Sequence, residues 1–207
     1  MSSSPNKNAP VYFTEYGIPI RNLWHMLCYA WNELPANSPL TLGEVESAPT
    51  LDVLFALVLL RSMQQRLRTG LGHAFVDETK TFRGVRGRIN FPESLKEHSF
   101  EKGEACCSFQ QYSANEPRNQ IILSTISRLI QAGDFGLDTA EADTIRHRLR
   151  QLARSLDGID QIELAPALVT RQFSIQNDHD YRLMLAVCEL ILQRQMPLEE
   201  QGARTVP

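Results

Sequence analysis

The segment Ile18–Trp31, with the sequence IPIRNLWHMLCYAW, constrains the fold of this chain more than any other stretch. It contains one charged residue, Arg21, and as a helix it would carry large apolar side chains on nearly every face. Leaving such surface in water costs roughly 25 cal/mol per Å². We therefore expect a buried helix that is capped by Asn22 and runs to about Glu33. The residues expected to pack against the apolar stretch at 53–60 are Trp24, Leu27, Tyr29 and Trp31.

Composition and charge place the chain among ordinary globular proteins. Its 207 residues are 43% hydrophobic and 22% charged, and the formal net charge is −3. No global field would therefore attract nucleic acid, and any such role needs a local basic patch. The one strongly basic block runs from Arg61 to Arg88, with seven bases against Asp77 and Glu78.

Targeting and membrane signals are not evident in the sequence. Residues 1–10 are polar and lack the apolar core of a signal peptide. The longest apolar run, at 53–60, is far shorter than the roughly 20 residues that span a bilayer. We expect a cytoplasmic protein without membrane contact, in which the cysteines are reduced thiols. These are Cys28, Cys106, Cys107 and Cys188.

Hydrophobic periodicity predicts an α+β fold that is mostly helical, with a small antiparallel sheet or hairpin between residues 71 and 112. The clearest helix is expected from Leu51 to about Thr69, capped by Thr50 and closed by Gly70. Its first half is apolar on all sides, which indicates a central buried helix. A polar loop is expected at 35–50. A short polar helix is expected from Pro92 to about His98, and further helices at 116–132, 139–156 and 181–195. Strands are expected at 74–76, 79–82, 88–91 and 106–112.

Catalytic chemistry finds little support in the sequence. Glu78 and Lys80 have the E-x-K spacing of a metal-dependent nuclease, and on a strand they would share one face. A second metal-binding carboxylate is needed, but Asp52 lies at a helix start and Asp77 would point to the opposite face. The cysteines lack zinc-site spacing and there is no P-loop. We therefore predict no catalytic, cofactor-binding or metal-ligating residues, and interpret Glu78 and Lys80 as a solvated strand face.

The best functional candidate is the segment RGVRGR at 83–88. Its glycines allow a tight turn, and its arginines offer bidentate donors for phosphates or carboxylates. The target could be a nucleic-acid backbone or an acidic protein, and a solvated hairpin turn is the alternative without function. The predicted partner-binding residues are Arg83, Gly84, Arg86, Gly87 and Arg88.

Four stretches of the chain together resemble the McrC family of McrBC-type modification-dependent restriction systems. The first, Ile18–Trp31, is similar to the family opening I-P-[IV]-R-N-[LI]-[WY]-x-M-L-x-Y-A-W, and residues 86–89 are similar to its G-R-I signature. The third comprises residues 109–115 and 118–123. It departs from the family at Asn115, where an acid is usual, and at Gln120 and Ser124, where Arg and Lys are common. The fourth and weakest comprises 156–159 and 181–192.

This resemblance implies a domain that docks on McrB, a GTP-hydrolysing AAA+ ring, and stimulates its hydrolysis. In the family a C-terminal PD-(D/E)xK domain then cuts DNA at 5-methylcytosine sites. We expect a disordered tail at 1–16, an McrC-like partner-binding domain at 17–196, and a polar tail at 197–207 where the nuclease domain would follow in a truncated or split gene product. The implied partner is an McrB-like hexamer, with DNA engaged indirectly and GTP and Mg²⁺ bound by the partner or the missing domain.

Three functions therefore remain open from the sequence. The first is a non-catalytic domain that stimulates the McrB-like GTPase through the turn at 83–88. The second is a small nuclease that uses Glu78 and Lys80. The third is a DNA-backbone binding module that uses the basic block at 61–88.

Overall fold

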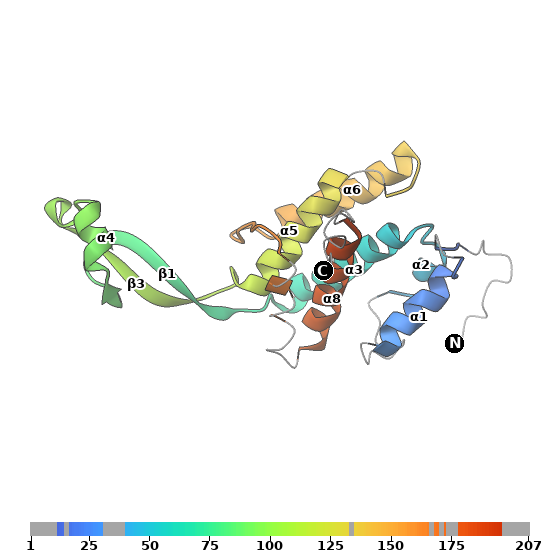
Figure 1. Cartoon of the computed structure of the whole chain (residues 1–207), viewed down its shortest axis with the longest axis horizontal. Helices are drawn as coiled ribbons and strands as arrows, with labels where there is room; N and C mark the ends of the chain where they lie inside the picture. The colour runs from blue at the N-terminus through green and yellow to red at the C-terminus, as the bar shows by residue number, and fades with distance from the viewer. Residues whose placement is uncertain are drawn as a thin grey trace, which may run out of the picture.

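A computed structural model describes residues 12–14, 17–30, 40–132, 135–165, 168–169, 172 and 178–195. It shows a helical body from which a long hairpin projects (Figure 1). We call residues 73–113 the arm and residues 84–103 the arm tip. The body helices are α1 (Ile20–Ala30), α2 (Leu42–Glu46), α3 (Leu51–Thr69), α5 (Pro117–Ala132), α6 (Thr139–Arg154) and α8 (His179–Gln195). The arm contains β1 (Ala74–Arg83), β2 (Arg88–Ile89), α4 (Phe91–Lys96), the 3-10 turn η2 (Phe100–Lys102) and β3 (Glu104–Ser113).

Helix α3 forms the centre of the body, as its apolar first half predicts. Residues 53–60 are buried except for the half-buried Leu57, and α5, α6 and α8 all pack against α3. The predicted ends are confirmed: the Thr50 hydroxyl accepts from the Val53 amide, and Gly70 follows the last turn and donates to the Arg66 carbonyl. Burial on every side explains why this segment tolerates no charge until Arg61.

Helix α1 differs from the sequence prediction in its start and in one of its faces. It begins at Ile20, so Asn22 lies within the first turn and does not cap the helix. Ile20, Trp24 and Cys28 are buried in the core at four-residue spacing, and Leu27 packs partly against it. The prediction was wrong for Tyr29, which is 89% exposed, because it lies on the face away from the core. Trp31 and Glu33 lie outside the described residues.

The loop expected at 35–50 contains a short helix, α2. Thr41 and Glu44 form a reciprocal capping box, in which the Thr41 hydroxyl accepts from the Glu44 amide and the Glu44 carboxylate accepts from the Thr41 amide. Val45 of this helix is buried, and α1 packs against α2. The sequence therefore contains a signal for this helix, which is a capping box followed by one apolar residue that packs in the core. The polar composition of the loop hid this signal.

The arm is an antiparallel ribbon of two long strands, with a short third strand at its end. β1 pairs with β3 over its whole length, from Ala74 opposite Ser113 to Arg83 opposite Glu104, and the short β2 pairs with the other edge of β3. The sequence predicted two short strands where the structure has one of ten residues. At about 3.3 Å per residue, each long strand extends about 33 Å. The predicted α+β fold with a hairpin between residues 71 and 112 is confirmed.

The chain before α1 folds back on itself. Phe13 forms a bridge with Pro19, and the Ile20 amide donates to the Tyr12 carbonyl at 3.0 Å. Most of the tail predicted at 1–16, and all of the tail predicted at 197–207, lie outside the described residues. Within the described part of the chain, no helix is long and apolar enough to cross a membrane.

The four cysteines are buried thiols, as predicted. Burial raises the pKa of Cys188 to about 12, and the thiolate is the reactive form of cysteine. We expect iodoacetamide at pH 8 to leave all four cysteines of the folded protein unmodified and to alkylate all four after unfolding in guanidinium chloride. Mass spectrometry with and without denaturant measures this. Rapid alkylation of any of the four in the folded protein would contradict the buried placement.

Candidate functional site

Two glycines shape the turn at the end of β1, as the sequence predicts. Gly84 and Gly87 have φ angles of +100° and +72°, in the region that side chains disfavour. A Cβ atom on Gly87 would lie 2.5 Å from the Ser108 carbonyl oxygen and 2.8 Å from the Phe109 Cβ, whereas one on Gly84 would meet nothing within 4 Å. Gly87 therefore allows the turn to fold back directly onto β3.

The three predicted arginines are exposed at this turn but lie on different faces of the ribbon. The Arg86 guanidinium lies over the Phe109 ring, 4.3 Å from its centroid. Arg88 pairs in register with Ser108, the neighbour of Phe109 on the opposite face. Arg83 pairs with Glu104, which shares the face of Ser108, but Arg83 lies four residues further along β3 and at its other edge. The guanidiniums therefore do not converge on one phosphate or carboxylate. They surround the tip and suit a partner that contacts it from more than one side.

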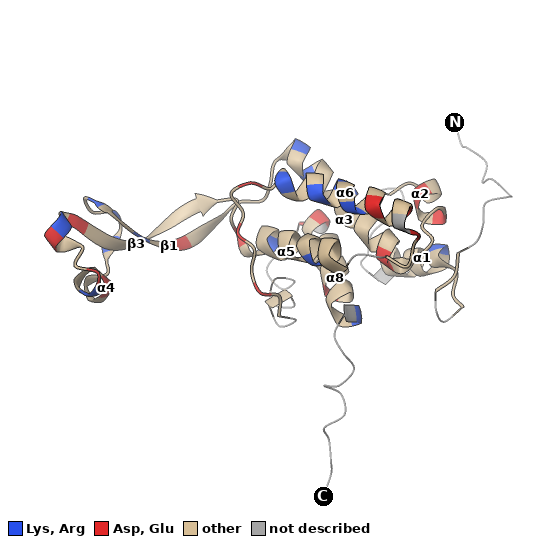
Figure 2. Ribbon diagram, turned by 90° about the horizontal axis from the view of Figure 1, so that it is seen from above, with Lys and Arg blue, Asp and Glu red and all other residues tan. Residues whose placement is uncertain are grey.

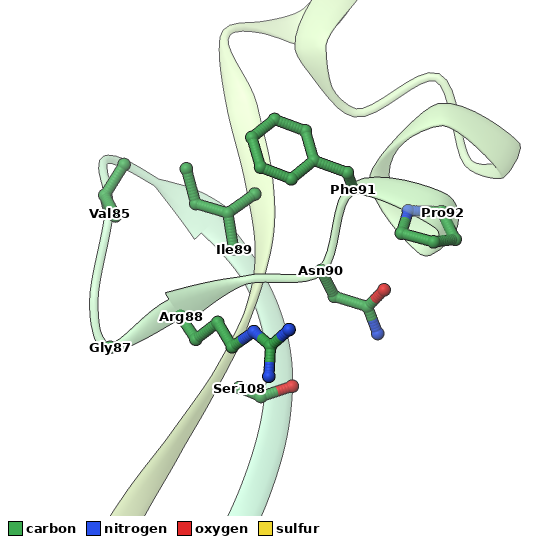
Figure 3. A pocket seen from close by; sticks show the side chains of 8 residues that line it. All are labelled: Val85, Gly87, Arg88, Ile89, Asn90, Phe91, Pro92 and Ser108. Atoms are coloured by element: carbon green, nitrogen blue, oxygen red, sulfur yellow. The ribbon is translucent and has the colours of Figure 1, made fainter.

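An apolar surface lies next to these arginines, and the sequence reasoning missed it. The side chains of Val85, Phe91 and Leu95 are 65%, 59% and 65% exposed. Phe100 is also exposed, and its ring centroid lies 6.0 Å from the ring centroid of Phe91. Figure 3 shows the hollow beside them, in which Ile89 and Phe91 point to one side of β2 and Arg88 to the other. The four-residue spacing of Phe91 and Leu95 was the available signal, but α4 was expected to be polar.

The tip is held on β3 by buried hydrogen bonds. The Asn90 side chain accepts from the Glu93 amide and so caps α4, and the Asn90 amide donates to the Cys106 carbonyl at 2.8 Å. The buried Ser94 hydroxyl accepts from the Cys106 amide at 2.9 Å and donates back to its carbonyl at 3.4 Å. These bonds fix α4 against the strand, so the exposed apolar side chains are presented on an ordered support.

The nuclease hypothesis lacks the metal site that it needs among the described residues. Lys80 and Glu78 share one face of β1, as predicted, and form an ion pair at 2.6 Å. Asp77 pairs with Gln110 on the other face, and Asp52 lies in the first turn of α3, 3.6 Å from Arg194. Within the described ranges, no three His, Cys, Asp or Glu residues gather as metal ligands. We interpret Glu78 and Lys80 as an ion pair on β1 of the arm.

The basic block at 61–88 does not form one surface. Arg61 donates to Glu44 at 2.8 Å, and Arg66 forms an ion pair with Asp178 at 2.5 Å, both in the body. The arginines of the tip lie at the far end of the arm, and Figure 2 shows this separation. The DNA-backbone hypothesis therefore loses the continuous patch that the sequence indicated.

Two of the three neutral residues that depart from the McrC pattern tether the segment after α6, and the third bonds to one of these two. The Asn115 side chain donates to the Asp160 carboxylate at 2.6 Å and accepts from the Asp160 amide at 2.9 Å. Gln120 donates to Asn115 at 2.8 Å, and the Ser124 hydroxyl accepts from the Ile162 amide at 2.8 Å. These positions therefore serve packing within the body, with no charged surface of their own.

Comparison with known proteins agrees with the motifs. The family model described as "McrBC 5-methylcytosine restriction system component" matches residues 8–207. The type IV methyl-directed restriction enzyme EcoKMcrBC of Escherichia coli (strain K12) is 29% identical over 185 residues, which cover 89% of this chain and 51% of that protein. The chain thus spans about half the length of this relative.

Two solved structures share the fold. The cryo-EM structure of the Thermococcus gammatolerans McrBC complex matches with a TM-score of 0.56 and 17% identity, covering 83% of this chain and 50% of that chain. A half-complex from the tetradecameric assembly of Thermococcus gammatolerans McrB AAA+ hexamers with bound McrC matches with a TM-score of 0.57 and 16% identity, covering 83% and 40%.

Replacing the glycine that touches β3 should loosen the arm tip. In Gly87→Ala the new Cβ meets the backbone of β3, whereas Gly84→Ala adds only the cost of a positive φ, about 1–2 kcal/mol. We expect hydrogen exchange in residues 84–103 to accelerate more in Gly87→Ala than in Gly84→Ala, with the body helices unchanged. Equal acceleration in the two variants would contradict the close approach of Gly87 to β3.

Proposed function

Because the chain belongs to the family of McrBC 5-methylcytosine restriction system components, we propose that it is the N-terminal, partner-binding region of an McrC-like subunit. In this proposal it docks on an McrB-like AAA+ ring and stimulates its GTP hydrolysis, and it cuts no DNA itself. The observation that carries the proposal is the arm, which presents exposed arginines and apolar side chains on an ordered tip far from the core.

The shape and the chemistry of the arm support this assignment. An extension of about 33 Å would let the tip reach into the channel of a ring. Exposed apolar side chains at its end are unfavourable in water, so a partner that covers them would form a more stable complex. The surrounding arginines would steer the tip toward acidic groups and would exclude unsuitable partners.

The proteins that this chain resembles support the choice of partner. The curated relative is a methyl-directed restriction enzyme, and one solved relative is McrC bound to McrB AAA+ hexamers. We propose that GTP and Mg²⁺ are bound by such a ring, that DNA is engaged through the assembled complex, and that cleavage needs a nuclease domain of the kind the family carries. The domain layout at 1–16, 17–196 and 197–207 belongs to the same proposal.

Removing two arginines of the turn should weaken the interaction with the ring. For Arg83→Ala combined with Arg86→Ala we expect the chain concentration that gives half-maximal GTPase stimulation to rise about tenfold, which corresponds to about 1.4 kcal/mol. Steady-state GTP hydrolysis by an McrB-like hexamer, titrated with the chain, measures this. Arg150→Ala combined with Arg154→Ala removes the same charge from the exposed face of α6 and should have little effect. An unchanged titration for the turn variant would overturn the role of the turn.

The apolar surface should contribute at least as much. For Phe91→Ser combined with Leu95→Ser we expect weaker binding to the ring by tenfold or more, because two side chains that a partner covers contribute about 1.5–3 kcal/mol each. Thermal unfolding should change little, since both side chains are exposed in the free chain. Met26→Ser combined with Tyr29→Ser on the exposed face of α1 is the matched control. Equal losses in the two double variants would assign the effect to general surface polarity.

A further inference from the structure

We propose that a buried polar cluster at the root of the arm is a positioning site, which sets the direction of the arm and thereby the maximal GTPase stimulation. The root cluster consists of Gly72, Glu116, Arg118, Asn119 and Tyr181. This inference rests on the proposed function, and it separates two properties of the arm. The tip would decide how tightly the ring is bound, whereas the root cluster would decide how much a bound arm stimulates.

One side chain ties together the two points where the arm leaves the body. Gly72 lies just before β1 and Ala114 just after β3. The Asn119 amide nitrogen donates to both of their carbonyl oxygens, at 3.0 Å and 2.8 Å. Asn119 itself lies in α5 and is completely buried. The spacing of the two strand roots is therefore set from within the body.

Tyr181 connects this junction to a second helix. Its hydroxyl donates to the Asn119 side-chain oxygen at 2.6 Å and accepts from the Gly72 amide at 2.8 Å. Burial raises the pKa of Tyr181, so the hydroxyl stays protonated at neutral pH and can donate. Tyr181 belongs to α8 and Asn119 to α5. The root of the arm is therefore hydrogen-bonded to two helices that pack against each other.

Charged side chains complete the cluster from two sides. Arg118 makes a two-point contact with Glu116, with its Nε 2.8 Å from Oε2 and its Nη2 2.5 Å from Oε1, and both residues are buried. The guanidiniums of Arg118 and Arg66 lie 4.4 Å and 4.6 Å from the centroid of the Tyr181 ring. The Tyr181 ring is thus in contact with both guanidiniums, in addition to the hydrogen bonds of its hydroxyl.

The cluster leaves no space for a side chain at Gly72. A Cβ atom there would lie 2.8 Å from Glu116 Oε1, 2.9 Å from Arg118 Nη2 and 3.0 Å from the Tyr181 hydroxyl. The φ angle of Gly72 is not positive, so the backbone conformation does not itself require a glycine. The close approach of the backbone to these polar atoms is the reason for a glycine at this position. The start of the arm is therefore enclosed by polar atoms in defined positions.

A buried ion pair is seldom more stabilising than a well-packed apolar alternative, so the cluster is better explained by geometry than by stability. Figures 1 and 2 show the arm projecting from the body, so the direction of the arm depends on its root. For a lever of about 33 Å, a rotation of roughly 10° at the root would move the tip by about 6 Å. Such a shift would misplace the tip in a binding site even if its own contacts were intact.

The test separates affinity from stimulation in the full chain. Tyr181→Phe keeps the ring and removes only the hydroxyl, and Gly72→Ala intrudes on the cluster. We expect each to lower the plateau of GTPase stimulation at least threefold while the half-maximal concentration stays within twofold of the wild type. Tyr112→Phe on the exposed arm and Gly43→Ala, whose Cβ would meet nothing within 4 Å, are the controls. A plateau that equals the wild type in both root variants, or a parallel loss of affinity, would overturn the proposal.

A second measurement needs no partner and distinguishes this inference from the proposed function. Spin labels on Val85→Cys at the tip and Gln151→Cys on α6 report the distance between arm and body, because the native cysteines are buried. We expect Tyr181→Phe to broaden or shift this distance distribution, and Tyr112→Phe to leave it unchanged. If the wild-type chain stimulates no McrB-like ring, the proposed function fails, whereas an unchanged distribution in Tyr181→Phe overturns the positioning role by itself.

Discussion

The fold depends on the complete burial of α3. Because residues 53–60 are apolar on all sides, other helices must enclose them, and α5, α6 and α8 do so. Neither long strand of the ribbon between α3 and α5 adds a buried residue to this core: β1 has none, and those of β3, Ala105–Cys107, lie at its tip end. It is therefore excluded from the body and projects as an arm, which starts where α3 ends and returns where α5 begins.

In the proposed function, the arm combines two kinds of surface that would serve different steps of association. Exposed arginines act at a distance and orient an approaching partner. Apolar side chains such as Phe91 and Leu95 would act only on contact, where the removal of water would make them the main contributors to affinity. An ordered tip limits the entropy lost on binding, and the bonds of Ser94 to Cys106 supply that order.

Sequence reasoning succeeded where local chemistry decides the structure. Thr50 and Gly70 define the ends of α3, and Gly84 and Gly87 define the turn, because capping and positive φ angles depend on a few neighbouring residues. It failed for Tyr29 and for α4, because composition does not show which face of an amphipathic helix finds a partner. The root cluster was also missed, since Gly72, Asn119 and Tyr181 lie far apart in the chain and only their meeting gives them a role.

The sequence by itself determined the family, the mostly helical class, the central helix and the existence of a glycine-arginine turn. These follow from residue order, apolar periodicity and backbone preferences, which are local properties. Only the tertiary structure decided that the turn lies at the end of a long arm, that its arginines lie on different faces, and that apolar side chains accompany them. The same holds for the buried junction at Asn119, because contacts between distant segments depend on how helices pack, and packing is a property of the whole chain.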